Sequence, residues 1–329
     1  MKPLVLITGA SGFVGSHLTR ELLKKKWNVR LLLRENSTIP VLNSSNSNVE
    51  IIRGDIRNQD AVEQAVNGVH YIFHLAAVLK GKNLSDFKRV NVEGTKNLCR
   101  AFAKNKNAKR FVYISSLAAA GPATGSTPLT ENDFGSPISF YGQTKWLGEQ
   151  IVLSYRNEFA SVILRPGIVY GPYEKDFFNF FKMMKWGIVF LPGNGEQRVS
   201  VVFIDDLIRA IVKVTQASSA MNQIFFIAEN RTYTWNEIIQ QLGRVMNRKY
   251  IVCKIPWKAV TMLALISEQW SQITKKAGLL NLDKIKEARA SAWIGNPEKM
   301  KKLLSFQCEI DLNQGLSETL IFYQQAKWI

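Results

Sequence analysis

Short apolar runs alternate with helix-like segments along the first half of the chain. The apolar runs are 4–8, 29–33, 49–55, 69–77, 109–116 and 161–170. Between them, apolar residues recur at helical spacing over 15–27, 60–66, 90–105 and 141–158. Strands that alternate with helices predict an α/β fold, a doubly wound parallel sheet with helices on both faces.

This rhythm breaks after Tyr170. The segments GNGEQR at 193–198 and VSVVFIDDL at 199–207 follow, with a helix-like run to Thr215. Such a change indicates a second region at the carboxyl ends of the strands, where open parallel sheets bind their ligands. We expect a main domain over 1–170, to which 199–228 returns, and a smaller C-terminal substrate-binding region built from 171–198 and 229–329.

A helical face is also predicted in the C-terminal part, formed by Trp257, Met262, Leu263, Ile266 and Trp270. We interpret it as a face that packs on the core. The apolar stretch within it, 259–266, falls far short of the roughly 20 residues that cross a bilayer.

Composition narrows the class of protein. The 329 residues are 46% hydrophobic and carry a net charge of +17, so a core is expected and anionic ligands are favoured. The basic residues are scattered without interleaved aromatics, which argues against nucleic-acid binding. The three cysteines show no paired spacing, and the first strand begins too early for a signal peptide, so a cytoplasmic location is expected.

A glycine-rich turn follows the first apolar run, in the sequence TGASGFVGSHL at 8–18. Gly9 permits a tight turn, Gly12 lets backbone amides approach a pyrophosphate, and Gly15 allows the next helix to pack close to the sheet. Because the turn lies between a strand and a helix, it predicts a dinucleotide site.

The GxxGxxG spacing resembles the extended short-chain dehydrogenase/reductase family, also called the NAD-dependent epimerase/dehydratase family. The resemblance continues through GDI at 54–56, HLAA at 74–77, VNVEGT at 90–95, SS at 115–116, YGQTK at 141–145, RPGIVYGP at 165–172 and VVFIDDL at 201–207. It implies a Rossmann-type fold, a homodimer that pairs helices 90–105 and 141–158, and cofactor contacts at Gly9, Ser11, Gly12, Phe13, Val14, Gly15, Arg34, Asp55, Ile56, Leu75, Ala76, Ala77, Asn91, Tyr141, Lys145, Pro166, Ile168 and Val169.

The segment YGQTK places Tyr141 and Lys145 one helical turn apart on the same face. A tyrosine with its ordinary pKa near 10 is a poor base at neutral pH. A lysine charge about 4 Å away contributes on the order of 4 kcal/mol, which would bring the pKa of Tyr141 near neutrality. The resemblance implies that Tyr141 exchanges a proton with an alcohol or ketone while a hydride moves to or from nicotinamide. It also implies that Ser116 orients the substrate and that Lys145 binds ribose.

Departures from the family pattern narrow the chemistry. Leu117 to Ala119 follow Ser116 where 4,6-dehydratases carry an Asp-Glu pair, so dehydration is not expected. No ligand cluster accompanies His70 or His74, so no metal is expected. Arg34 ends the second strand where an acidic residue favours NAD, so NADP is favoured, although the adjacent Glu35 could take the acidic role.

Three functions stay open. The run YISSLAAAGP at 113–122 resembles 3β-hydroxysteroid dehydrogenases and dihydroflavonol reductases, which favours net oxidation or reduction of an apolar alcohol or ketone. The GNGEQR segment resembles nucleotide-sugar epimerases, in which Arg198 would bind the substrate diphosphate, but Ile168 replaces their asparagine. A dinucleotide-sensing protein without catalysis is the third hypothesis, opposed by the intact Ser116, Tyr141 and Lys145.

Overall fold

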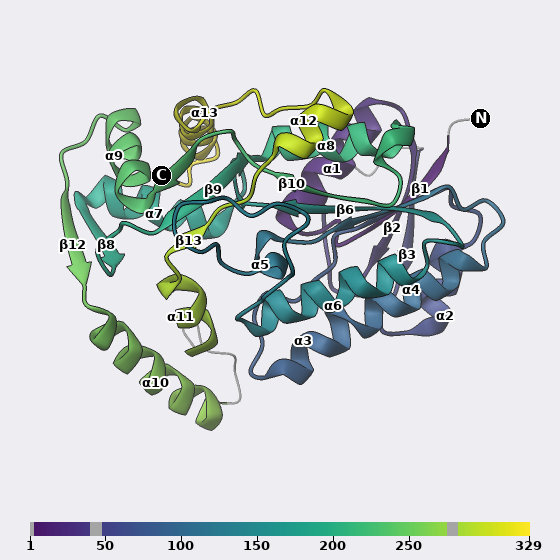
Figure 1. The fold of residues 1–329 in the computed structure, drawn as a ribbon, viewed down its shortest axis with the longest axis horizontal. Coiled ribbons are helices and arrows are strands. Elements are labelled where there is room, and N and C mark those ends of the chain that lie inside the picture. Colours follow the sequence, from purple (N-terminus) through teal and green to yellow (C-terminus); the bar gives the residue numbers. More distant parts are fainter. Residues whose placement is uncertain (1–2, 40–47, 275–281) are drawn as a thin grey trace.

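Seven parallel strands form the central sheet of the protein (Figure 1). The structure is a computed structural model that describes the backbone of residues 3–39, 48–274 and 282–329, and their side chains except at 269–274. The predicted Rossmann-type sheet is confirmed, because its continuous apolar runs are covered on both faces. Across the sheet the strands are β10 (Gln223–Ile227), β6 (Ala160–Pro166), β5 (Arg110–Ile114), β4 (Tyr71–His74), β1 (Leu4–Thr8), β2 (Asn28–Leu33) and β3 (Val49–Arg53).

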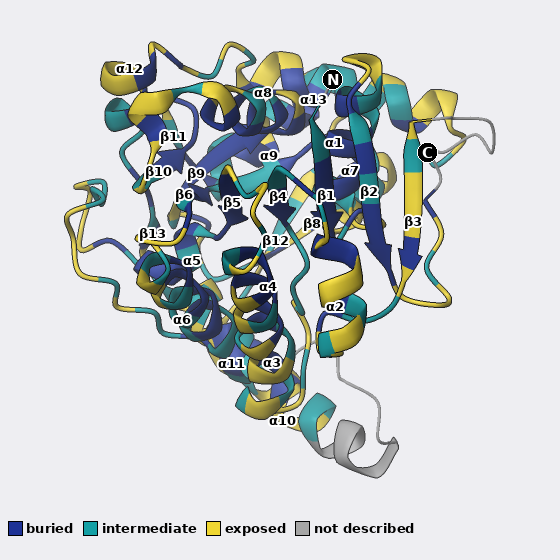
Figure 2. Ribbon diagram, turned by 90° about the vertical axis from the view of Figure 1, so that its right-hand side faces the viewer, coloured by how far each residue is buried: buried dark blue, intermediate teal, exposed yellow. Residues whose placement is uncertain are grey.

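Helices cover both faces of this sheet (Figures 1 and 2). One face carries α1 (Phe13–Lys24) and α8 (Ile204–Gln216), which pack on each other. The other face carries α2 (Gln59–Val66), α3 (Leu84–Asn91), α4 (Glu93–Ala103) and α6 (Phe140–Ser154). The helix expected over 90–105 therefore begins earlier than predicted and is interrupted at Val92.

The run predicted as one strand, 161–170, is divided between two sheets at Gly167. A Cβ on Gly167 would lie 2.4 Å from the carbonyl oxygen of Ser200, so only glycine allows the two chains to approach this closely. Within 199–228, β10 is a strand of the central sheet and α8 packs on a face of that sheet, whereas β9 belongs to a second sheet. That sheet consists of β7 (Ile168–Tyr170), β9 (Arg198–Phe203), β11 (Thr232–Thr234) and β13 (Ala292–Trp293).

Most of the remaining elements lie in the half of the molecule that holds the second sheet, whereas α12 packs on β10 (Figure 1). A parallel pair of strands, β8 (Ile188–Pro192) and β12 (Ile251–Ile255), stands apart from both sheets. The helices are α7 (Lys175–Trp186), α9 (Trp235–Val245), α10 (Trp257–Thr274), α11 (Leu282–Arg289), α12 (Glu298–Leu304) and α13 (Leu312–Gln325).

The helix predicted in the C-terminal part is present as α10, but the predicted core face is wrong. Met262, Leu263 and Ile266 are 59%, 50% and 57% exposed. Trp257 is partly buried, and the side chain of Trp270 lies outside the described residues.

The buried face of α10 lies on its other side. Val260 and Ala264 pack with Ile285 of α11. Apolar residues occur on both sides of this helix, so its period alone cannot tell which side is covered. In the described part of the chain, no helix is long and apolar enough to cross a bilayer.

A buried ion pair fastens α6 to the central sheet. The Arg165 guanidinium at the end of β6 donates hydrogen bonds of 2.9 and 2.6 Å to the Glu149 carboxylate of α6. The Ser115 hydroxyl donates to the same carboxylate at 2.5 Å. Glu149 is 0% and Arg165 4% exposed. Both charges are removed from water, so each depends on the other to remain buried.

We predict that Glu149→Ala lowers the free energy of unfolding by about 3–5 kcal/mol, because the Arg165 charge would stay buried without its partner. Urea unfolding followed by circular dichroism measures this loss. Glu21→Ala, which removes a partly exposed partner of Lys25, is the control and should cost no more than about 0.5 kcal/mol. A loss below about 1 kcal/mol for Glu149→Ala would contradict the role of the pair.

Candidate active site

The turn between β1 and α1 makes backbone contacts that leave no room for side chains. Gly9 has a φ of +78°, and a Cβ on it would lie 2.6 Å from the amide nitrogen of Ala76. A Cβ on Gly15 would lie 2.2 Å from the Gly9 carbonyl oxygen. Gly12 precedes α1, where no side chain caps the first-turn amides. These amides attract a phosphate, so the turn fits the pyrophosphate of a dinucleotide.

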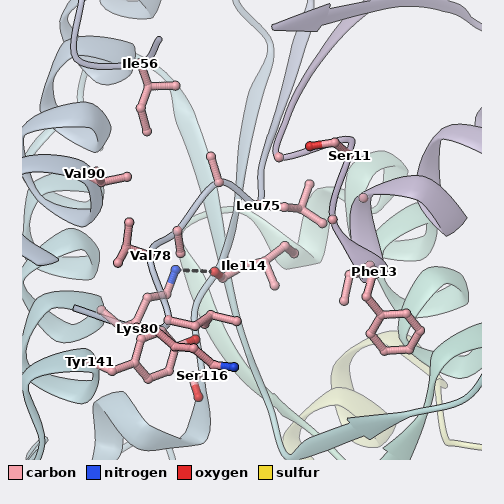
Figure 3. A pocket seen from close by; sticks show the side chains of 18 of the residues that line it. Ser11, Phe13, Ile56, Leu75, Val78, Lys80, Val90, Ile114, Ser116 and Tyr141 are labelled. Atoms are coloured by element: carbon pink, nitrogen blue, oxygen red, sulfur yellow. Dashed lines mark hydrogen bonds between the residues drawn. The ribbon is translucent and has the colours of Figure 1, made fainter. Parts of the chain in front are cut away.

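A cavity of about 780 Å³ extends from this turn to Tyr141 along the carboxyl ends of the strands (Figure 3). This is the place where an open parallel sheet binds a dinucleotide. Sixteen of the 18 residues expected to contact the cofactor line it, namely Gly9, Ser11, Gly12, Phe13, Val14, Gly15, Arg34, Asp55, Ile56, Leu75, Ala76, Ala77, Tyr141, Lys145, Pro166 and Val169.

The other two expected residues, Asn91 and Ile168, do not line this cavity. Asn91 is buried behind its wall, where it accepts a hydrogen bond from the amide of Val78 at 2.7 Å and donates to the hydroxyl of Thr144 at 3.0 Å. It thus connects a cavity-lining loop to α6. Ile168, one residue beyond the change of sheet at Gly167, instead lines a neighbouring cavity.

Basic groups gather at the end of the cavity formed by β2 and β3. Arg34 lines the cavity, as does Arg57, which the sequence analysis did not identify. Arg57 donates hydrogen bonds of 2.8 and 2.9 Å to Asp55 and holds the pKa of that carboxyl below its ordinary value. Glu35, the acidic alternative to Arg34, is exposed and is not among the lining residues. This end of the cavity therefore presents guanidinium groups where the adenosine ribose is expected.

The three predicted catalytic residues meet at the other end of the cavity. Ser116 follows β5 and precedes the short helix α5 (Leu117–Ala120), and its hydroxyl accepts a hydrogen bond from the amide of Ala118 at 3.1 Å. Figure 3 shows Ser116 beside Tyr141, and the proximity of the Ser116 hydroxyl lowers the pKa of the phenol in part. Lys145 lies one turn further along α6, buried, with its ammonium donating to the carbonyl of Ile114 at 2.6 Å.

The electrostatics of this group differ from the prediction. Burial raises the pKa of Tyr141 to about 12, the nearby Ser116 hydroxyl lowers it in part, and the Glu287 carboxylate raises it. Burial lowers the pKa of Lys145 to about 7, against an opposing effect of Glu149. The predicted lowering of the Tyr141 pKa toward neutrality is therefore wrong for this arrangement. The reason is that desolvation outweighs any lysine charge and that the ammonium bonds a backbone carbonyl instead.

Helix α11 fixes the start of α6, the helix that carries Tyr141 and Lys145, a contact that the sequence did not indicate. The amide of Phe140 donates to both carboxylate oxygens of Asp283, at 3.0 and 3.1 Å. The Ser139 hydroxyl donates to Glu287 and also caps α6 by accepting from the amide of Gly142 at 3.0 Å. More than 140 residues separate these partners along the chain, so no local pattern indicates the contact.

A second cavity of about 670 Å³ adjoins the first and shares Ser116 and Tyr141 with it. Its charged residues are Asp176, Lys284 and Glu287, and no arginine lines it in the described part of the chain. Most of its wall is apolar and consists of Leu117, Ala118, Ile168, Phe180, Leu191, Pro192, Val199, Trp235, Trp257, Val260, Ile285, Ala288, Ala290 and Trp293.

Arg198 is the predicted substrate residue that the structure does not bring to this site. It begins β9 and is exposed, whereas its neighbours Gln197 and Val199 line the cavity. Successive side chains of a strand point to opposite faces, so Arg198 is directed away. Gln197 was not predicted, and its buried side-chain oxygen has no hydrogen-bond partner within the described structure.

The chain is similar in sequence and in fold to several known proteins. The sequence profile described as "NAD dependent epimerase/dehydratase family" matches residues 5–228. Ceramide reductase of Caulobacter vibrioides is 26% identical, covering 99% of this chain and 96% of that protein. 3 beta-hydroxysteroid dehydrogenase/Delta 5-->4-isomerase of Mycobacterium tuberculosis is 27% identical over 78% of this chain and 73% of its own length. The crystal structure of UDP-glucose 4-epimerase from Thermotoga maritima superposes with a TM-score of 0.82, covering 98% and 99% of the two chains at 22% identity.

The lowered pKa of Lys145 predicts a pH-dependent stability. Between about pH 7 and the ordinary lysine pKa near 10, the unfolded chain binds a proton at Lys145 that the folded chain does not bind, so stability rises with pH. Relative to Lys145→Met, the wild-type free energy of unfolding should increase across this window, by at most about 1.4 kcal/mol per pH unit, and stay level below it.

Urea unfolding at pH 6, 7.5 and 9 measures this difference. Lys302→Met, which removes an exposed positive charge, controls for the change in net charge. A wild-type stability that falls relative to Lys145→Met as the pH rises would show that Lys145 does not titrate in this way.

Proposed function

The chain belongs to the NAD-dependent epimerase/dehydratase family and is an NAD(P)-dependent enzyme of the extended short-chain dehydrogenase/reductase type, and we propose that it reduces the ketone of an apolar substrate. Such enzymes transfer a hydride between nicotinamide and a secondary alcohol or ketone. The proposal concerns the substrate class, the direction of net reaction and the residues that carry the chemistry.

One observation carries the proposal, namely the apolar cavity that meets Ser116 and Tyr141. A nucleotide sugar brings two phosphate charges, which a binding site ordinarily meets with arginine or lysine. In the described structure the cavity offers only Lys284 as a cation, beside Asp176 and Glu287. Ile168 adds a further apolar side chain to its wall. An alkyl or polycyclic ketone matches this lining. The similarity to a ceramide reductase and a hydroxysteroid dehydrogenase supports the same class.

The proposed residue roles follow from the geometry of the meeting point. When bound, the reduced nicotinamide supplies the hydride that reaches the carbonyl carbon. Tyr141 donates its phenolic proton to the carbonyl oxygen, and Ser116 holds that oxygen by a hydrogen bond. Burial keeps the pKa of Tyr141 at about 12, so the phenol is protonated at neutral pH, which suits reduction. Lys145 binds the ribose and supports the return of a proton to Tyr141.

Nucleotide-sugar epimerisation is the second candidate, favoured by the match to the fold of UDP-glucose 4-epimerase. Against it, Arg198 lies outside the cavity, so the diphosphate contact expected from GNGEQR has no counterpart there. A protein that only senses dinucleotides would have no need for Ser116, Tyr141 and Lys145 in one cavity.

NADP is the proposed cofactor form. Arg34 and Arg57 line the adenosine end of the first cavity, whereas Glu35 does not. A guanidinium fits the 2′-phosphate that distinguishes NADP from NAD, while a carboxylate there would repel it.

The proposal includes a homodimer and a reducing, cytoplasmic compartment. Helix α6 keeps Trp146 and Leu147 partly exposed, and such apolar side chains suit a helix that pairs with its copy. The thiols of Cys99, Cys253 and Cys308 are all free, which suits a reducing environment.

Turnover of ketones tests the proposed function. Purified protein with NADPH should reduce a ketosteroid or a long-chain alkyl ketone. Tyr141→Phe should lower kcat by about 100- to 10,000-fold, because only the proton-bearing oxygen is lost, while the Kd for NADPH stays within about twofold. Tyr155→Phe, at the far end of α6, is the matched control and should keep full activity. Conversion of UDP-glucose without net NADPH oxidation, and no reduction of any ketone, would instead establish an epimerase.

Cofactor selectivity depends on Arg34. Arg34→Ala should raise the Kd for NADPH by about 10- to 150-fold, the equivalent of a charge-assisted contact of about 1.5–3 kcal/mol. The Kd for NADH should change little, because NADH lacks the 2′-phosphate. Fluorescence titration measures both constants, with Glu35→Ala as the companion variant. Equal losses for the two cofactors in Arg34→Ala, or a selective loss of NADH in Glu35→Ala, would refute the NADP assignment.

A further inference from the structure

Exposed apolar side chains concentrate at one end of the protein. Fourteen large apolar residues are exposed within the described structure, and eight of them lie on α7, β8, β12 and α10. These elements lie at the end away from the N-terminus, where α10 extends outward after β12 (Figure 1). We call these eight residues the end surface. They are Trp186, Ile188, Phe190, Ile251, Met262, Leu263, Leu265 and Ile266.

The β8–β12 pair contributes a sheet face that is largely uncovered at the Ile188–Ile251 end within the described structure, whereas Ile255 packs against α10 and α11. Along β8, Ile188 and Phe190 are exposed, while the alternate residues Val189 and Leu191 are buried. Ile251 pairs with Ile188 in parallel register, so both side chains lie on the same face. A face that meets water would ordinarily carry polar residues at these positions, so this one is suited to an apolar partner.

Helix α10 adds a second exposed apolar face. At about 100° per residue, Met262, Leu263, Leu265 and Ile266 fall on one side of the helix, opposite the buried Ala264. They are 46–59% exposed. One apolar side of the helix therefore packs on the protein, and the other apolar side has no partner in the described structure.

The two segments that carry the residues of the end surface are basic, and the acidic residues of α7 and α10, Asp176 and Glu268, lie just outside them. Between Arg244 and Ser267 there is no Asp or Glu, and the same holds between Phe177 and Gly195. The exposed cations in these segments are Lys185, Arg244, Arg248, Lys249, Lys254 and Lys258. A second copy of the chain would place these cations against one another across a twofold interface, so self-association is opposed by like charges.

We propose that the end surface docks on an anionic lipid bilayer. Its apolar side chains would lie among the acyl chains near the headgroups, and its cations would meet anionic headgroups, as in helices that lie in a membrane interface. Trp186, 76% exposed at the end of α7, has the apolar ring and polar N–H that suit this depth. The described part of the chain would lie on the bilayer, since none of its helices is long and apolar enough to cross it.

The same elements also form a wall of the apolar cavity. Leu191 and Pro192 of β8 and Trp257 and Val260 of α10 line that cavity from the inside, while Phe190 and Met262 face outward. Docking would thus set the substrate cavity one layer of side chains from the lipid. The docking inference does not rest on the proposed reaction, because lipid binding is measured without turnover.

Co-sedimentation with vesicles tests the proposal. The full chain should pellet with vesicles of phosphatidylcholine containing one third phosphatidylglycerol, and far less with phosphatidylcholine alone. Ile266→Glu should lower the partition coefficient by about tenfold or more, since it replaces a membrane-facing apolar side chain by a charge. Lys258→Gln should lower it by about fivefold, and only for the anionic vesicles.

Ile321→Glu is the matched control, because Ile321 is 51% exposed on α13, outside the end surface. This variant should bind vesicles like the wild type, and circular dichroism should show all variants folded. Wild-type protein that stays in the supernatant, or equal losses in Ile266→Glu and Ile321→Glu, would overturn the proposal. So would a dimer in light scattering that Ile266→Glu dissociates without any vesicle binding by the wild type, since the surface would then join two copies.

Discussion

The arrangement of the catalytic end depends on one buried carboxylate, that of Glu149. It accepts hydrogen bonds from Arg165 at the end of β6 and from Ser115 at the end of β5, so it ties α6 to the two strands beside it. Ser116 follows one of those strands, and Tyr141 and Lys145 lie on α6. Because a charge without water needs every partner in place, the helix has little freedom to slide or turn relative to the sheet.

Burial sets the chemical character of the groups that this carboxylate positions. Without water, the pKa of Tyr141 rises and that of Lys145 falls, so both side chains favour their neutral forms. The Lys145 ammonium finds an acceptor in the Ile114 carbonyl and lies 4.1 Å from the centre of the Tyr113 ring. This environment suits the proposed proton donation by a neutral Tyr141 phenol, and the charge of Glu149 opposes the lowering of the Lys145 pKa.

The sequence predicted those parts of the structure whose cause is local. The strands of the central sheet are apolar runs, and the turn at Gly9 to Gly15 carries its geometry in its glycines, so both could be recognised before any contact was known. Contacts between distant segments could not be predicted. Asp283 and Glu287 hold the start of α6 from more than 140 residues away. The change of sheet at Gly167 moved Ile168 from the expected cofactor cavity to the neighbouring one.

The same limit explains why Arg198 does not line the cavity and why the predicted core face of α10 is wrong. A strand presents alternate residues to opposite faces, so a shift of one position separates Gln197, which lines the cavity, from Arg198, which does not. On α10, apolar residues occupy both sides, and only the position of α11 selects Val260 and Ala264 for burial. A pattern of apolar residues along the sequence predicts an apolar face but not the segment that packs on it. An apolar face that stays exposed in the folded protein therefore indicates a partner outside the chain. The basic residues beside this face favour a partner with negative charge.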